Sequence, residues 1–150
     1  MKHMSANARQ AKAYLNQYHK LRRTLSSLER RVEELEVKAQ GVGAIRYDKD
    51  RVQTSPANQL EADAFRLIEV REEYRQVLLE YAEVALTIER QVKQIEPDLY
   101  NRILHMRYIE TDPGGYQMSL RRISWKLHKN YNYICNQHGA ALIAFAEKFL

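Results

Sequence analysis

The chain has 150 residues, of which 45% are hydrophobic and 29% are charged, and its net charge is +5. This size and composition suit one core with an appended module, and they exclude two large domains and a wholly disordered chain. Cys135 is the only cysteine, so an intramolecular disulfide is excluded. The sequence has neither an apolar signal core nor an apolar stretch long enough to span a membrane. We therefore expect a cytoplasmic protein with no membrane partner.

A heptad pattern marks the first helical segment. Apolar residues recur every seven positions in two sets, and the second set follows the first by three residues, as in the seam of a coiled coil. The sets are Ala11, Tyr18, Leu25, Val32 and Ala39, and Tyr14, Leu21, Leu28 and Leu35. The pattern predicts one long helix that packs against another helix.

The second segment begins with a helix-entry signal, in which Ser55 is placed as the N-cap and Pro56 at the first helical position. Its apolar stripe is wider than a two-helix seam. Pro97 ends the predicted helix, because proline disfavours helical geometry at the preceding residue. The stripe comprises Leu60, Leu67, Tyr74, Tyr81, Ile88 and Ile95, flanked by Val70, Val77, Leu78, Val84 and Val92.

The two long helices have similar predicted lengths, which favours pairing within one chain. We expect a long antiparallel coiled-coil hairpin over residues 5–96, with a charged, glycine-containing tip loop at about residues 41–54. The competing arrangement is a parallel coiled coil between chains, which would leave the wide second stripe uncovered unless more chains joined. In either case, the long helices are the expected site of homo-oligomer formation.

Shorter helices are predicted for residues 97–150. One covers Asp98 to Ile109 and is followed by a turn at residues 112–115, where proline precedes two glycines. Ser119 caps a helix that runs to about Leu127, and Asn130 caps another that runs to about Phe149. The predicted fold is therefore all-α: a long antiparallel coiled-coil helical hairpin followed by a small helix-turn-helix domain.

The charge distribution points to a phosphate-binding surface. Residues 113–146 contain no carboxylate, and residues 1–28 carry six basic residues and no acid. An interleaved carboxylate would repel the phosphates that such cations neutralise. If the long helices fold back on each other, the two basic segments form one surface. The ordinary alternative is a solvated helix face, and it is stronger for the amino-terminal run.

The last two helices have helix-turn-helix spacing. Leu120, Ile123 and Leu127 form one apolar face, and a second face follows after a short break. Amides and tyrosines at the start of the second helix are suited to base edges and phosphates, whereas the preceding cations are suited to phosphates. The predicted DNA-binding residues are Arg121, Arg122, Lys126, Lys129, Asn130, Tyr131, Asn132, Tyr133, Asn136 and Gln137.

Three stretches resemble a known family. They are residues 104–109 (LHMRYI), the Leu120-x-x-Ile-Ser helix start with Leu127, and the His138-Gly-x-Ala-Leu142 ending, and Asn130 falls on the family's serine cap. Residues 99–142 thus resemble the C-terminal domain of Gram-positive phage late-transcription regulators of the RinA and ArpU type, itself similar to sigma factor region four. The resemblance implies a transcription regulator encoded by a phage or prophage.

Two features depart from that family's pattern. His128 and Lys129 occupy a turn that usually carries glycine, and Trp125 stands where the family prefers a charged residue. We expect Trp125 either to pack under the long helices or to lie in a partner interface.

Catalytic and metal chemistry have no convincing candidates. His128, Cys135 and His138 lack the paired spacing and four ligands of a structural zinc site. The glutamates of the second long helix, Glu61, Glu69, Glu72, Glu73, Glu80 and Glu83, are predicted to form a solvated face. The tyrosines at heptad positions are predicted to lie in the core with their hydroxyls near its rim. We expect no enzyme activity, cofactor or metal.

The leading hypothesis is a sequence-specific DNA-binding transcription regulator that reads promoter or operator DNA. Its expected partner is double-stranded DNA, with RNA polymerase as a candidate second partner and self-association through the long helices, because one small helix-turn-helix makes few base contacts. The alternative is a coiled-coil interaction or scaffold protein that does not bind DNA.

Overall fold

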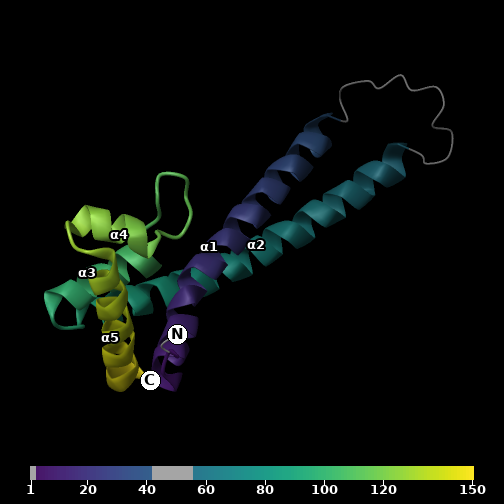
Figure 1. The fold of residues 1–150 in the computed structure, drawn as a ribbon. Helices are drawn as coiled ribbons and strands as arrows, with labels where there is room; N and C mark the ends of the chain where they lie inside the picture. Colours follow the sequence, from purple (N-terminus) through teal and green to yellow (C-terminus); the bar gives the residue numbers. More distant parts are fainter. Residues whose placement is uncertain (1–2, 42–55) are drawn as a thin grey trace. The chain divides into compact units, whose positions relative to one another are not determined.

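The computed structural model describes residues 3–41 and 56–150. It contains five labelled helices, which Figure 1 shows: α1 (Ala6–Gly41), α2 (Pro56–Lys93), α3 (Asp98–Tyr108), α4 (Leu120–Leu127) and α5 (Tyr131–Phe149). Outside them, the described residues add only an isolated bridge between Thr111 and Gln117, so the all-α prediction is confirmed for this part of the chain. The predicted cap Ser55 and the tip loop beyond residue 41 lie outside the described residues.

Two compact units divide the chain. One comprises Met1–Leu21 and Tyr81–Leu150, and the other comprises Arg22–Glu80. These units group residues differently from the predicted domains, residues 5–96 and 97–150. The reason is that the first turns of α1 and the last turns of α2 share a core with the short helices.

The unit Arg22–Glu80 is built on the heptad residues of α1 and on the predicted apolar stripe of α2. Leu28 and Leu35 of α1 form a core with Val70 of α2, and partly buried side chains from the heptads and the stripe pack around them: Val32, Leu67, Tyr74 and Val77. Beside this core, Arg71 Nη2 forms an ion pair with Glu36 Oε1 at 2.7 Å. The predicted stripe of α2 is not buried throughout, because Leu60 and Leu78 are exposed.

The other unit has a core to which α1, α2, α3 and α5 contribute. The start of α1 has a buried face wider than the predicted seam, because Ala8 and Leu15 are buried together with the heptad residues Ala11 and Tyr18. The remaining buried residues come from α2 and the segment after it, from α3 and its end, and from α5: Ala85, Ile88, Val92, Ile95, Leu104, Tyr108, Ile109, Ala141, Leu142, Phe145 and Ala146.

Tyrosine hydroxyls lie at the rim of this core, as the heptad positions predict. Tyr14 donates to Gln91 Oε1 at 2.8 Å, and Tyr18 donates to Glu89 Oε1 at 3.0 Å. Each ring therefore packs inside while its hydroxyl keeps a polar partner. Burial, with Tyr81 and Glu89 nearby, raises the pKa of Tyr18.

A second cluster holds the three short helices together. Ile103 of α3, Met118, Ile123 of α4 and Ile134 of α5 are almost completely buried.

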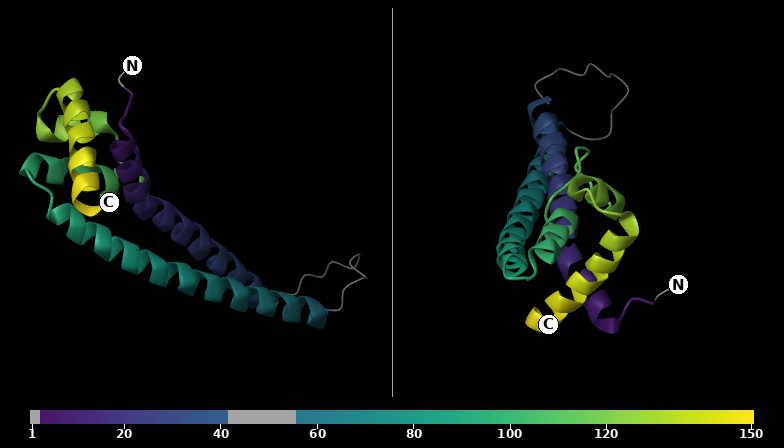
Figure 2. Two further views of the ribbon diagram at one scale, coloured as in Figure 1. Left: turned by 90° about the horizontal axis from the view of Figure 1, so that it is seen from below. Right: turned by 60° about the vertical axis from the view of Figure 1, so that its left-hand side comes forward.

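The loop between α3 and α4 is held by Arg107, whose Nη1 donates a hydrogen bond to the Met118 carbonyl at 2.7 Å. Gly115 has a φ of 82° in the predicted turn, a value that glycine adopts readily. Figures 1 and 2 show α5 crossing α4 steeply.

Candidate nucleic-acid interface

Helix α4 begins at the cap that the sequence predicts. The Ser119 hydroxyl accepts a hydrogen bond from Arg122 N at 3.1 Å, which satisfies one of the free amides of the first turn. Ile123 and Ser124 are buried, so the other side of the helix faces solvent with Arg121, Trp125 and Lys126. A short, well-capped helix thus presents two cations and one indole.

Arg122 occupies an intermediate position on α4. Its side chain is partly buried, and its Nε is buried with no hydrogen-bond partner among the described residues. Packing therefore restricts the stem of this side chain more than that of the exposed Arg121 or Lys126. A guanidinium on a restrained stem loses less side-chain entropy when it meets a phosphate.

The turn between α4 and α5 forms without glycine. His128 adopts the left-handed conformation at φ 54° and ψ 43°. His128 N donates to the Trp125 carbonyl at 3.2 Å, and Lys129 N donates to the Ser124 carbonyl at 3.0 Å, which is the hydrogen-bond pattern of a Schellman motif. The departure from glycine therefore changes the backbone strain of the turn and leaves its geometry intact.

Replacing His128 by glycine is expected to stabilise the protein. The left-handed conformation costs an L-residue about 1–2 kcal/mol, and the entropy that glycine adds to the unfolded chain offsets part of this gain. We expect His128→Gly to raise the free energy of unfolding by about 0.5–1 kcal/mol, measured by urea denaturation. Lys129→Gly is the matched control, because Lys129 has no positive φ; an equal gain in both variants would refute the strain argument.

Helix α5 starts at the predicted Asn130 cap. Asn130 Oδ1 accepts hydrogen bonds from Asn132 N at 2.8 Å and from Tyr133 N at 3.3 Å. Ile134 is buried one turn later and fixes which side of the helix faces the body of the unit. The opposite side exposes Asn132, Tyr133 and Asn136.

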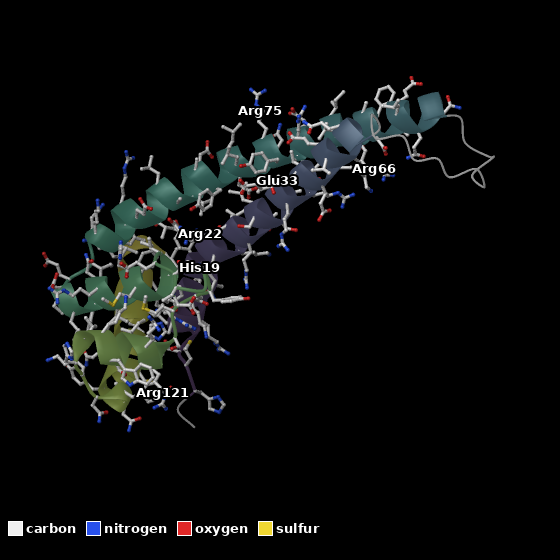
Figure 3. The ribbon with its side chains drawn as sticks, turned by 90° about the horizontal axis from the view of Figure 1, so that it is seen from above. His19, Arg22, Glu33, Arg66, Arg75 and Arg121 are labelled. Atoms are coloured by element: carbon white, nitrogen blue, oxygen red, sulfur yellow. The ribbon has the colours of Figure 1, made fainter. Side chains whose placement is uncertain are left out.

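Arg121 and Tyr131 connect the two helices. The guanidinium carbon of Arg121 lies 4.4 Å from the centroid of the Tyr131 ring, a cation–π contact between α4 and the first residue of α5. Figure 3 labels Arg121 on its helix. The structure thus brings these two predicted residues into direct contact, whereas Lys129 and Asn130 lie in the connecting turn. Gln137 is partly buried, so it is less accessible than the other predicted amides.

Trp125 is 66% exposed, so the expectation that it packs under the long helices is wrong. Its helix is eight residues long and buries only one side, and Trp125 falls on the other side with Arg121. The second expectation, a position in a partner interface, stays a prediction. The sequence signal that favours it is a large apolar ring among cations.

A buried pair behind the exposed face was not predicted. Tyr108 Oη and His138 Nε2 lie 2.8 Å apart, and their rings stack with centroids 5.7 Å apart. Burial, with Arg107 and Lys12 nearby, lowers the pKa of His138 to about 4, so the ring is neutral at pH 7. Burial also raises the pKa of Tyr108. Because α3 carries Tyr108 and α5 carries His138, the pair fixes α5 on the body of the unit.

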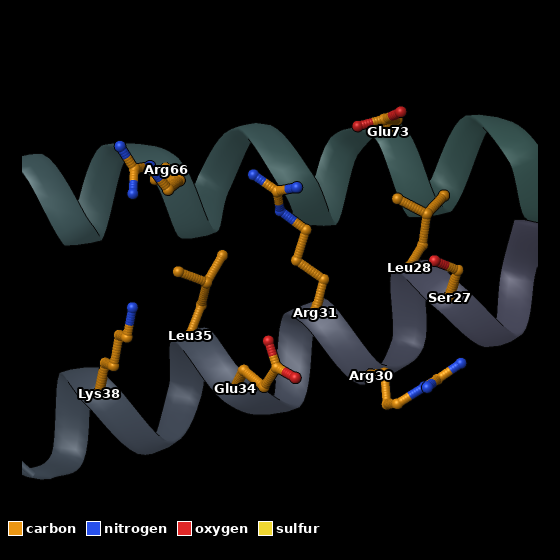
Figure 4. A pocket seen from close by; sticks show the side chains of 9 residues that line it. All are labelled: Ser27, Leu28, Arg30, Arg31, Glu34, Leu35, Lys38, Arg66 and Glu73. Atoms are coloured by element: carbon orange, nitrogen blue, oxygen red, sulfur yellow. The ribbon is translucent and has the colours of Figure 1, made fainter.

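The described residues offer few other sites. They contain no group of three metal-ligating side chains, and no helix among them is long and apolar enough to cross a membrane. The unit Arg22–Glu80 has an open hollow between α1 and α2, shown in Figure 4. Its lining combines four cations with two carboxylates, whereas the four cations of α4 and the following turn have no carboxylate among them. The lining charges are Arg30, Arg31, Lys38, Arg66, Glu34 and Glu73.

Comparisons with family models, curated proteins and solved structures find no match to this chain.

Proposed function

We propose that the chain is a sequence-specific DNA-binding transcription regulator. In this proposal α4, the turn and α5 act as a helix-turn-helix of the sigma-region-four type that follows a long antiparallel coiled-coil hairpin. The observation that carries it is the combination of two capped helices with an exposed surface of cations and amides, in a stretch of sequence without carboxylates.

The two helices have separate roles. Arg121, Arg122, Lys126 and Lys129 contact phosphates and hold the module on the duplex, in a way that does not depend on sequence. The exposed side of α5 enters the major groove, where Asn132 and Asn136 can each bond adenine through both amide atoms. Tyr131 and Tyr133, both exposed, reach phosphates or thymine methyl groups.

The resemblance of residues 99–142 to phage late-transcription regulators supports an origin in a phage or prophage and a role at promoter or operator DNA. The long helices then serve self-association or contact RNA polymerase, because a single small module makes few base contacts.

A second candidate function is a scaffold that binds another protein and not DNA. The observation that favours it is the apolar side of α2, where Phe65, Ile68 and Leu79 are exposed. A scaffold requires neither amides nor an acid-free surface on α5, so a failure of the protein to bind DNA is the result that would favour it.

The direct test of sequence reading is selection of bound duplexes from a random library. The wild-type protein is expected to enrich a defined motif, and Asn132→Ala is expected to weaken the preference at one base position by about 1–3 kcal/mol, roughly 5- to 150-fold. Gln17→Ala removes an amide from α1 and serves as the control. Absence of an enriched motif, or the same motif from Asn132→Ala, would contradict base reading by Asn132.

A further inference from the structure

The outer side of α2 in the unit Arg22–Glu80 carries an uncovered apolar stripe. Phe65, Ile68 and Leu79 are 61%, 62% and 58% exposed. Ile68 and Leu79 are each two residues from a side chain that packs on α1, and two residues on a helix are about 200° apart. They therefore lie on the side of α2 away from the α1 contact, whose side chains are Leu67, Val70, Tyr74 and Val77.

This stripe has the spacing of a coiled-coil seam with charges at its centre. Phe65, Glu72 and Leu79 are seven residues apart, and Ile68 and Arg75 follow the first two by three. Figure 3 shows Arg75 pointing away from α1. Glu72 accepts a hydrogen bond from Gln76 at 3.2 Å, whereas Arg75 has no ion pair or hydrogen bond with any residue the structure describes.

We propose that this stripe, the α2 seam (Phe65, Ile68, Glu72, Arg75 and Leu79), binds the same seam of a second copy in antiparallel orientation. In an antiparallel pair the first core position of one heptad faces the fourth position of the other. The twofold axis of the pair then passes midway between Glu72 and Arg75 along the helix. These two charged residues are the seam positions nearest to the axis, so they set the register.

Charge complementarity selects this orientation. Antiparallel pairing about that axis sets Glu72 against Arg75 of the second copy and Ile68 against its Leu79, and symmetry repeats both contacts. Parallel pairing would instead set Glu72 against Glu72 and Arg75 against Arg75, and like charges across a seam are unfavourable. The seam thus specifies its partner by both its apolar and its charged positions.

The expected dimer is weak. In this register the seam positions that face each other run from Ile68 to Leu79, about 16 Å, and one helix pair of that length buries less than the roughly 1,200 Å² of a standard interface. The α2 seam is a surface for the self-association in the proposed function, and the inference rests on that part of the proposal. The test uses no DNA, so a negative result would count against the α2 seam and not against base reading by α5.

Sedimentation of the full chain over a concentration series tests the surface. The wild-type protein is expected to shift from monomer to dimer, and Ile68→Glu is expected to stay monomeric. Val37→Glu is the matched control, because Val37 is 67% exposed on α1, outside the seam. A wild-type monomer throughout the series, or a dimer that Ile68→Glu leaves unchanged, would overturn the proposal. Circular dichroism checks that each variant keeps its helices.

A charge swap and a cross-link test the orientation. Glu72→Arg alone is expected to abolish the dimer, and adding Arg75→Glu is expected to restore it. In a Cys135→Ser background, Ile68→Cys chains mixed with Leu79→Cys chains are expected to form a disulfide, whereas either variant alone is not, because its two sulfurs would lie about 16 Å apart along the helices. Cross-linking by either variant alone would overturn the antiparallel register.

Discussion

Binding of the protein to duplex DNA is expected to weaken about 100-fold, for each copy bound, when the salt concentration rises from about 50 to 200 mM. Four cations, Arg121, Arg122, Lys126 and Lys129, are available for phosphates on α4 and the following turn. Each neutralised phosphate releases condensed counterions, so four contacts give a slope of about −3.6 for log affinity against log salt. Fluorescence anisotropy of a labelled duplex measures this slope.

Arg122→Ala is expected to weaken binding to all duplexes alike and to reduce the salt slope by about one. Arg102→Ala is the matched control, because it removes the same charge from α3, where Arg102 pairs with Asp98 at 2.9 Å. Equal slopes for the wild type and Arg122→Ala would exclude Arg122 from the phosphate contacts. Equal effects of both variants would mean that net charge, and not this surface, attracts the DNA.

Trp125 supplies a second readout for the same titration. It is the only tryptophan, and it is exposed on the side of α4 that carries Arg121. Contact of this side with DNA would change its emission, whereas a protein partner elsewhere would not.

Local signals account for what the sequence could predict. Ser119 and Asn130 were identifiable as caps because a cap depends on residues within one turn, and both side chains accept the expected amide hydrogen bonds. In the unit Arg22–Glu80 the buried residues Leu28 and Leu35 come from the predicted heptads of α1, since one helix faces one partner there, whereas the buried Val70 comes from the residues that flank the repeat of α2. The exposed amides of α5 follow from the same reasoning, because Ile134 fixes the buried side.

Contacts among several helices account for what was missed. Leu15 does not fit a two-helix seam, yet it is completely buried, because the start of α1 shares its core with α3 and α5 as well as with α2. The Tyr108–His138 contact joins residues 30 positions apart and has no signature in either segment. Likewise, the sequence predicted a wide apolar stripe on α2, but the exposed apolar residues Phe65, Ile68 and Leu79 lie outside that stripe and were identified only from the fold.

Acidification is expected to destabilise the unit that contains α5. The folded-state pKa of His138 is about 4, below the ordinary value of 6.5, because the ring is buried near Arg107 and Lys12. The unfolded chain therefore binds the proton more readily than the folded chain. The contribution of the neutral ring to stability is fully present above pH 6.5 and is lost as the pH falls through 4, and it amounts to about 3 kcal/mol.

Urea denaturation at several pH values between about 7 and 4 measures this loss, and His138→Gln isolates it from the carboxylates that titrate in the same range. Glutamine cannot be protonated there, so the stability of the variant is expected to fall less steeply on acidification than that of the wild type. Parallel pH profiles would mean that His138 is not held neutral in the folded protein. Because His138 lies on the same helix as Asn132 and Asn136, its protonation is expected to loosen the helix that presents both amides.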